Sequence, residues 1–162
     1  DTHYLQLFIW DSKQECVVGG YRLGPGPALY QQLGIEGFYI HSLFEIETGF
    51  HTVMQYALEL GRSFIIPDYQ RKPLPLYLLW GGILEYLLTH PECRYLIGPV
   101  SISKFYSKIS KSVIVAFKKY AKQNATFIGF NLDPNFSGAL EGLMLMDIQN
   151  LPTSTLKMLK KS

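Results

Sequence analysis

The chain has 162 residues, of which 48% are hydrophobic and 17% charged, and its formal net charge is +2. This length suits one domain that buries roughly two-thirds of its unfolded surface. The small net charge, without a dense basic patch that also carries aromatic residues, excludes a nucleic-acid-binding protein. The two cysteines and four histidines lack metal-ligand spacing, so we expect free thiols in a reducing cytoplasm and no metal site. No apolar run approaches the ~20 residues of a membrane-spanning helix.

The first half of the chain is predicted to be mainly β-structure. Leu5–Trp10 and Glu15–Leu23 flank a short polar turn, which predicts a β-hairpin. Phe38–Ile46 is rich in aromatic and branched residues, which favours another strand. Met54–Ile66 is ambiguous between helix and strand, and we interpret it mainly as a strand with a bulge or a close backbone approach at Gly61.

The second half alternates helices with strands. Leu76–Leu88 is apolar on nearly all sides, so we expect a buried helix with Pro75 as its first residue. The remaining predicted elements are a helix over about 105–123 and strands over Tyr95–Ile102, Phe127–Asn131 and Leu143–Ile148. This order predicts a mixed α/β fold, with an antiparallel meander followed by a parallel β–α–β crossover.

Glu59 and Arg62 place an acid and a base on one predicted strand. In a regular strand, residues 59 and 62 face opposite sides of the sheet. A bulge at Gly61 would bring both charges to one side. An exposed ion pair at a strand edge explains the same two residues equally well.

The stretch Gln70–Pro75 predicts a loop that leads into the apolar helix. Backbone amides at a helix N-terminus can hold a phosphate, and Arg71 and Lys72 add positive charge there. Pro73 and Pro75 lack an amide hydrogen, so they remove two donors from this loop. An ordinary strand-to-helix turn is the alternative interpretation.

Gly98–Ser101 lies within the next predicted strand. Pro99 interrupts its hydrogen-bond ladder, so we expect two central strands to splay and admit an extended thioester chain. Ser101 and Ser103 can hydrogen-bond a reacting carbonyl or a leaving thiol. The structural alternative is that they are serines at a strand end.

The segment from Glu59 to Ser103 resembles the core of the GNAT-superfamily N-acyltransferases that make ornithine and glycine lipids, which are often labelled hemolysin-like. The Glu-Leu-x-Arg pattern at 59–62 is also similar to that of acyl-homoserine-lactone synthases. Other segments that resemble this group, in the same order, are Gly20–Gly24, Gly37–Phe44 and Phe127–Asp147. The resemblance implies a GNAT fold, with a mixed, mostly antiparallel sheet flanked by helices and with splayed central strands.

The resemblance implies transfer of a fatty or 3-hydroxy-fatty acyl chain from acyl carrier protein to the amine of an amino acid, in membrane aminolipid biosynthesis. Glu59 would accept a proton from the amine, directly or through water, and Arg62 would orient Glu59 or bind an acceptor carboxylate. Ser101 completes the predicted catalytic residues. The predicted donor-binding residues are Ile65, Ile66, Gln70, Arg71, Lys72, Leu74, Leu78, Gly98, Val100 and Ser103. Attack would be direct, without a covalent enzyme intermediate or a tightly bound cofactor.

Two departures from the family pattern refine this hypothesis. The family's phosphate loop reads Gln/Arg-x-x-Gly-x-Gly/Ala, and here Pro73 and Pro75 occupy its small-residue positions. This favours the single phosphate of acyl-ACP over acyl-CoA. We also expect residues 1–162 to be one GNAT-like domain that lacks the family's first strand and helices and omits a segment near residues 115–122.

Two other functions fit the same residues. One is an acetyl-CoA-dependent acetyltransferase that acts on a small amine, and the other is a non-catalytic module that binds an acyl chain or its carrier. Arg22, Arg62 and Arg94 are all candidates to bind an acceptor carboxylate. A lipid product would also suit peripheral contact with the inner membrane.

Overall fold

The computed structural model describes residues 2–102, 122, 124–133 and 139–153. The strands and α-helices are β1 (Leu5–Asp11), β2 (Cys16–Pro25), α1 (Gly26–Leu33), α2 (His51–Gln55), β3 (Ala57–Ile65), α3 (Pro73–Thr89), β4 (Tyr95–Ile102), β5 (Ala125–Asp133) and β6 (Ala139–Asp147). Short 3-10 turns are η1 (Gly34–Gly37), η2 (Tyr39–Ser42), η3 (Thr48–Phe50), η4 (Pro67–Tyr69) and η6 (Ile148–Asn150). The predicted helix over 105–123, Ser103 and the expected gap near 115–122 lie outside the described residues, apart from residue 122.

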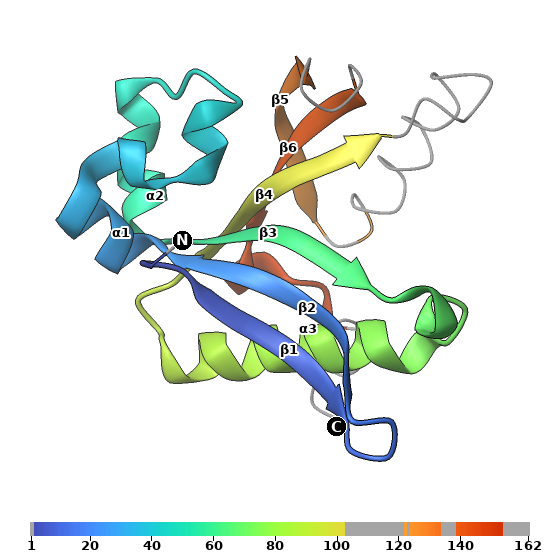
Figure 1. The fold of residues 1–162 in the computed structure, drawn as a ribbon. Coiled ribbons are helices and arrows are strands. Elements are labelled where there is room, and N and C mark those ends of the chain that lie inside the picture. Colours follow the sequence, from blue (N-terminus) through green and yellow to red (C-terminus); the bar gives the residue numbers. More distant parts are fainter. Residues whose placement is uncertain (1, 103–121, 123, 134–138, 154–162) are drawn as a thin grey trace.

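The strands form one six-stranded sheet in the order β1-β2-β3-β4-β6-β5. Among the strands of the described residues, β3 and β4 pair in parallel and the other neighbours pair antiparallel. Helix α3 runs along one face of the β1–β3 half, and α1, α2 and the turns η1, η2 and η3 gather at the other face (Figure 1). The expected mixed, mostly antiparallel sheet flanked by helices is confirmed.

The sheet has an apolar core on each side. The core beneath α3 consists of Leu23, Leu58, Leu60, Ile83, Leu87, Cys93, Leu96 and Met146. The core beneath α1 and the turns consists of Leu29, Phe38, Ile40, Met54, Ala57, Ile97 and Leu143. Successive residues of β3 therefore alternate between the two cores, as a pleated strand requires.

The predicted strand over Phe38–Ile46 is wrong, because this segment folds as the 3-10 turn η2 with irregular chain after it. Phe38 and Ile40 are fully buried beneath the sheet. The amides of Tyr39 and Ile40 donate to the Glu59 carboxylate instead of to a neighbouring strand. Burial and the Glu59 carboxylate, which accepts from these amides, override the strand propensity of these residues.

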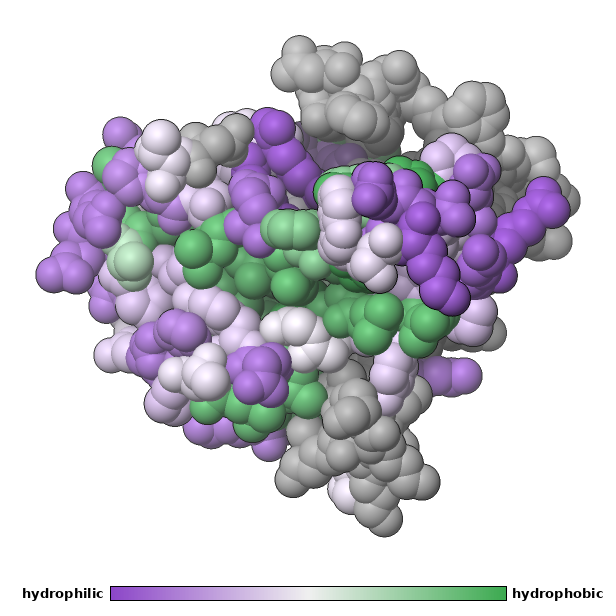
Figure 2. All heavy atoms as spheres, turned by 60° about the horizontal axis from the view of Figure 1, so that its bottom comes forward, coloured by the Kyte–Doolittle hydropathy of each residue, from purple (hydrophilic) through white to green (hydrophobic). Residues whose placement is uncertain are grey.

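Helix α3 begins at Pro73, two residues before the predicted start, and it is not buried on all sides. Its buried residues recur every four positions and are Pro75, Leu79, Ile83 and Leu87. Leu74, Leu78 and Leu88 are 59%, 46% and 65% exposed on its outer side. Figure 2 shows the hydrophobic band that crosses this face of the molecule. No helix among the described residues is long and apolar enough to cross a membrane.

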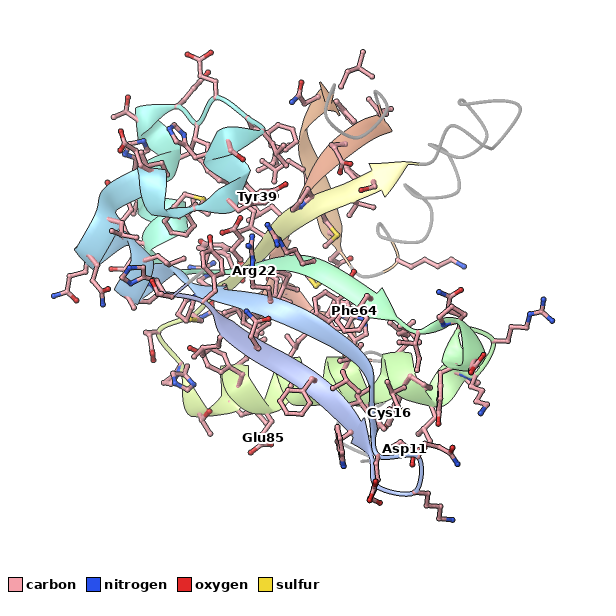
Figure 3. The ribbon with its side chains drawn as sticks, in the orientation of Figure 1. Asp11, Cys16, Arg22, Tyr39, Phe64 and Glu85 are labelled. Atoms are coloured by element: carbon pink, nitrogen blue, oxygen red, sulfur yellow. The ribbon has the colours of Figure 1, made fainter. Side chains whose placement is uncertain are left out.

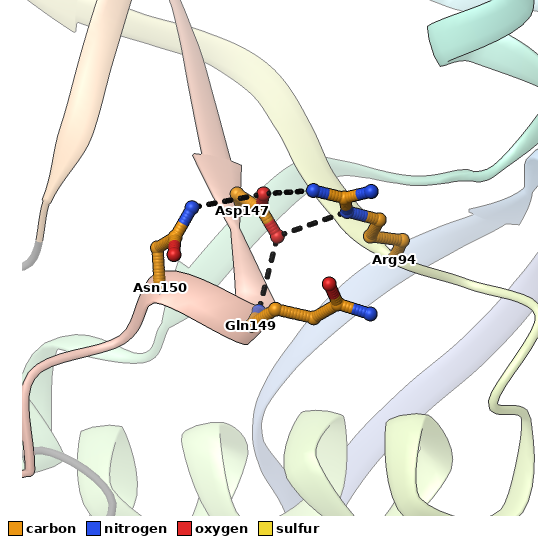
Figure 4. Close-up of polar contacts among 4 residues, drawn as sticks. All are labelled: Arg94, Asp147, Gln149 and Asn150. Atoms are coloured by element: carbon orange, nitrogen blue, oxygen red, sulfur yellow. Dashed lines mark hydrogen bonds and ion pairs between the residues drawn. The ribbon is translucent and has the colours of Figure 1, made fainter.

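An ion pair joins the start of β4 to the end of β6 (Figure 4). Arg94 Nη2 lies 2.7 Å from Asp147 Oδ2, and Arg94 Nε donates to Oδ1 at 3.3 Å. Asp147 also accepts from the backbone amide of Gln149 and from the side chain of Asn150. The guanidinium of Arg94 lowers the pKa of Asp147, so the carboxylate stays charged. This cluster adds a side-chain link at one end of two strands that already pair along eight positions.

Candidate active site

The central strands β3 and β4 form an open fork. They pair at only three positions, the last of which is Glu59 opposite Ile97. Beyond this pair, β3 continues to Ile65 and β4 to Ile102 without further pairing, and the two strands diverge (Figure 1). The predicted splaying is confirmed, and the backbone groups that face each other across the fork form no ladder.

The apex of the fork is set by Gly98 and Pro99. A Cβ atom on Gly98 would overlap the carbonyl oxygen of Leu60, so only glycine permits this close approach of the two backbones. Pro99 follows directly and has no amide hydrogen. It nevertheless keeps its place opposite Leu143 of β6, so the strand separates only on its β3 side.

Glu59 sits at the apex of the fork and is 1% exposed. Its Oε1 accepts from the Ile40 amide at 2.8 Å. Its Oε2 accepts from the Tyr4 hydroxyl at 2.5 Å and from the Tyr39 amide at 3.1 Å. Burial raises the pKa of Glu59, and these hydrogen bonds partly offset the effect. The carboxylate is thus enclosed and supplied with donors.

Arg22 and two tyrosine rings complete the surroundings of Glu59. The Arg22 side chain is 4% exposed, and its Cζ lies 4.4 Å from the Tyr4 ring centroid and 5.0 Å from that of Tyr39. Figure 3 shows Arg22 and Tyr39 between the helical turns and β3. The positive charge of Arg22 also lowers the pKa of Glu59, as a smaller contribution. No pattern in the sequence singled out Tyr4, because its contact with Glu59 spans 55 positions.

Arg62 lies on the expected bulge. The register shifts between the pairs Arg22–Gly61 and Gly20–Phe64, which leaves an extra residue in β3. Arg62 adopts a left-handed backbone conformation there, with φ at 47°, and its side chain is exposed. Among residues 2–102, no hydrogen bond or ion pair joins Arg62 to Glu59. The structure therefore groups Glu59 with Tyr4 and Arg22 and leaves Arg62 at the surface.

The predicted phosphate loop connects β3 to α3. Gln70 Nε2 donates to the carbonyl of Ile65 at 2.9 Å, so this side chain closes the loop on itself. Arg71 and Lys72 are exposed, and the Lys72 ammonium lies 4.3 Å from the Tyr69 ring centroid. Because α3 begins with Pro-Leu-Pro, its first turn presents fewer amide hydrogens than usual.

A small pocket of about 190 Å³ lies between this loop, the end of β3 and α3. Its lining residues are Tyr21, Ser63, Phe64, Ile65, Gln70, Leu76 and Leu79. Of the predicted donor-binding residues, Ile65 and Gln70 line it. Leu74 and Leu78 do not, because the helical repeat turns them to the outer side of α3.

The other predicted site residues lie farther along the two arms of the fork. Ile66 and Val100 are half-buried, and Ser101 is exposed near the end of β4. A larger pocket of about 410 Å³ is lined by Tyr56, Arg94 and Tyr95, among others, at the closed end of the β3–β4 pair. In the described ranges no group of His, Cys, Asp or Glu could hold a metal ion.

Comparisons with known proteins agree with this geometry. Residues 1–80 match the family described as "Acetyltransferase (GNAT) domain". A protein of Bacteroides thetaiotaomicron named glycine N(alpha)-acyltransferase is 27% identical over 124 residues, which span 72% of this chain but only 37% of that protein.

Solved structures share the fold, and two of them illustrate the match. A CoA-dependent acyl-homoserine lactone synthase, BjaI, solved with SAM and isopentyl-CoA, superposes with a TM-score of 0.58 at 18% identity, over 99% of this chain and 64% of that one. A GNAT-family protein of Desulfovibrio desulfuricans gives a TM-score of 0.52 at 14% identity, over 90% and 69%. The fold expected from the sequence is confirmed, and the matches support the acyltransferase class.

Replacing Gly98 tests the apex of the fork. Gly98→Ala should lower the free energy of unfolding by about 2 kcal/mol, because the new methyl group must push the Leu60 carbonyl away. Urea unfolding followed by circular dichroism measures the change. Gly81→Ala is the matched control, because a Cβ atom there meets nothing within 4 Å. This substitution should leave the stability unchanged or raise it, since alanine favours a helix over glycine. Equal stability of Gly98→Ala and wild type would contradict the tight apex.

Proposed function

Because the chain has a GNAT fold, we propose that it is an N-acyltransferase that moves an acyl chain from a phosphopantetheine thioester to the amine of an amino acid. The observation that carries this proposal is the open fork between β3 and β4 beside the buried carboxylate Glu59. Unpaired backbone groups in such a fork can hold an extended pantetheine chain and polarise the thioester carbonyl. The amine would then attack that carbonyl directly, next to a carboxylate able to take up its proton.

The finer assignment is a fatty or 3-hydroxy-fatty acyl chain and an amino-acid acceptor, in the synthesis of membrane aminolipids. The relative named glycine N(alpha)-acyltransferase supports an amino acid as the acceptor, although this chain spans about a third of its length. Arg62, exposed on the bulge, is suited to bind the acceptor carboxylate. Arg94 is less suited, because Asp147 already engages it.

Glu59→Gln tests the catalytic assignment. Wild-type protein mixed with an acyl thioester and an amino acid should release free thiol, and the variant should do so about 100-fold more slowly, because an amide accepts no proton. Thiol release is followed by absorbance, and thermal unfolding checks that the variant folds. Glu36→Gln, an exposed substitution in η1, should leave the rate unchanged. An unchanged rate in Glu59→Gln would remove this residue from the mechanism.

The donor is proposed to be acyl carrier protein rather than CoA. The two prolines at the start of α3 leave few amides for a pyrophosphate. Exposed Arg71 and Lys72 suit one phosphate and an acidic carrier surface.

Comparing donors tests this choice. We expect kcat/KM for acyl-ACP to exceed that for acyl-CoA. This preference should weaken as salt is added, and the double variant Arg71→Ala/Lys72→Ala should lose it. Lys122→Ala, another exposed lysine, serves as the control. An equal or higher kcat/KM with short-chain acyl-CoA would instead support the acetyl-CoA-dependent alternative.

Peripheral membrane contact is proposed through the outer side of α3. Leu74, Leu76, Leu78 and Leu88 are exposed on this helix, and Figure 2 shows a hydrophobic band on this side of the molecule. Exposed Arg71 and Lys72 precede the helix, where they can meet anionic lipid headgroups. The protein should co-sediment with vesicles that contain phosphatidylglycerol. Leu78→Gln/Leu88→Gln should weaken binding severalfold, whereas Leu33→Gln, on α1, should not. No binding by wild type would exclude membrane contact and leave the enzymatic assignment unaffected.

A further inference from the structure

Glu59 is poorly placed to touch a substrate amine itself. The side chain is 1% exposed, and both of its oxygens already accept hydrogen bonds from the protein. Two of the three donors are backbone amides, which cannot pass a proton on. A proton must therefore reach this carboxylate through the third donor, the hydroxyl of Tyr4.

Tyr4 has the geometry of such a connection. It directly precedes β1 and is only half-buried, whereas Glu59 is enclosed. Its hydroxyl lies 2.5 Å from Glu59 Oε2 and 3.1 Å from the Gly37 carbonyl, so its single proton is directed mainly at the carboxylate. The same oxygen accepts from the Tyr39 amide at 3.0 Å. One lone pair of the hydroxyl remains for a further donor, such as an amine.

Arg22 favours movement of a proton along this pair. Its guanidinium stacks over the Tyr4 ring at 4.4 Å and is 4% exposed, so little water screens its charge. That charge stabilises negative charge on Tyr4 as well as on Glu59. Burial nevertheless raises the pKa of Tyr4, so the phenol holds its proton until a second proton replaces it.

We propose that Tyr4 relays the proton of the attacking amine to Glu59, an inference that rests on the acyltransferase function proposed above. As the N–C bond forms and the C–S bond breaks, the amine proton passes to the Tyr4 oxygen while the Tyr4 proton passes to Glu59 Oε2. The leaving thiolate then takes up one proton, which restores the Glu59 carboxylate. The products are an amide and a free thiol, so atoms and charges balance.

The groups around Glu59 limit what else can titrate there. Tyr4 precedes β1, Arg22 comes from β2, and η2 presents the amides of Tyr39 and Ile40 together with the Tyr39 ring beside Arg22. The paired residue on β4 is Ile97, which does not titrate. The pH dependence of the proton transfer is therefore governed by the Tyr4–Glu59 pair in the field of Arg22.

Tyr4→Phe tests the relay, with Tyr39→Phe as the matched control. Both rings lie over Arg22, but Tyr39 contacts Glu59 through its backbone amide, which the substitution retains. Thiol release from an acyl thioester is measured with an amino acid from pH 6 to pH 10. We expect Tyr4→Phe to lower kcat about 100-fold at neutral pH, with KM for the donor little changed. The deficit should shrink as pH rises, because solvent then removes the amine proton.

A double variant separates the relay from a merely structural role. If Tyr4 acts through Glu59, adding Tyr4→Phe to Glu59→Gln should slow thiol release little further. The relay is overturned if Tyr4→Phe has the wild-type kcat at every pH. It is also overturned if the loss of kcat is constant with pH and adds to the loss caused by Glu59→Gln. Both outcomes leave the acyltransferase function in place. Absence of thiol release by wild type with every amino acid would overturn both.

Discussion

The arrangement around the fork depends on the buried carboxylate of Glu59. An isolated carboxylate inside a protein costs several kcal/mol unless donors surround it, and Glu59 obtains its donors from Tyr4, Tyr39 and Ile40. These donors come from the segment before β1 and from the turn η2, which therefore fold over the same face of the sheet. The requirement to satisfy Glu59 thus positions the residues around the apex of the fork.

The fork itself results from opposing constraints at the two ends of a short parallel pair. At the closed end, the amides of Arg94 and Tyr95 both donate to the Tyr56 carbonyl, and Ala57 pairs with Tyr95. At the apex, Gly98 lets the backbone of β4 approach the Leu60 carbonyl of β3 closely. Past that point β4 stays paired with β6, and β3 stays paired with β2. The two halves of the sheet therefore separate. Because β3 stays paired with β2 and β4 with β6, the opening belongs to the sheet itself, which suits a site that must hold a chain in one orientation.

Local sequence patterns predicted an element correctly where one apolar face or one turn is enough to define it. The hairpin of β1 and β2 and the bounds of β4 follow from short apolar runs and turn residues, and the structure confirms them. The pattern of α3 indicated a helix correctly but gave no reason to expect exposed leucines. The strand predicted over Phe38–Ile46 was wrong, because apolar content alone cannot distinguish a strand from a turn whose amides donate to a distant side chain.

The sequence by itself determined the mixed α/β class and the break in pairing beside Pro99, since both depend on residue type and near neighbours, and its resemblance to a known family made Glu59 a candidate. Only the tertiary structure decided which groups meet Glu59. Tyr4 and Arg22 lie 55 and 37 positions away along the chain, and the pairing of β2 with β3 brings Arg22 there. Arg62, three positions away, turns to solvent because the bulge rotates its backbone. Proximity in sequence sets the face of a strand, but the packing of separate elements sets the partners of a buried charge.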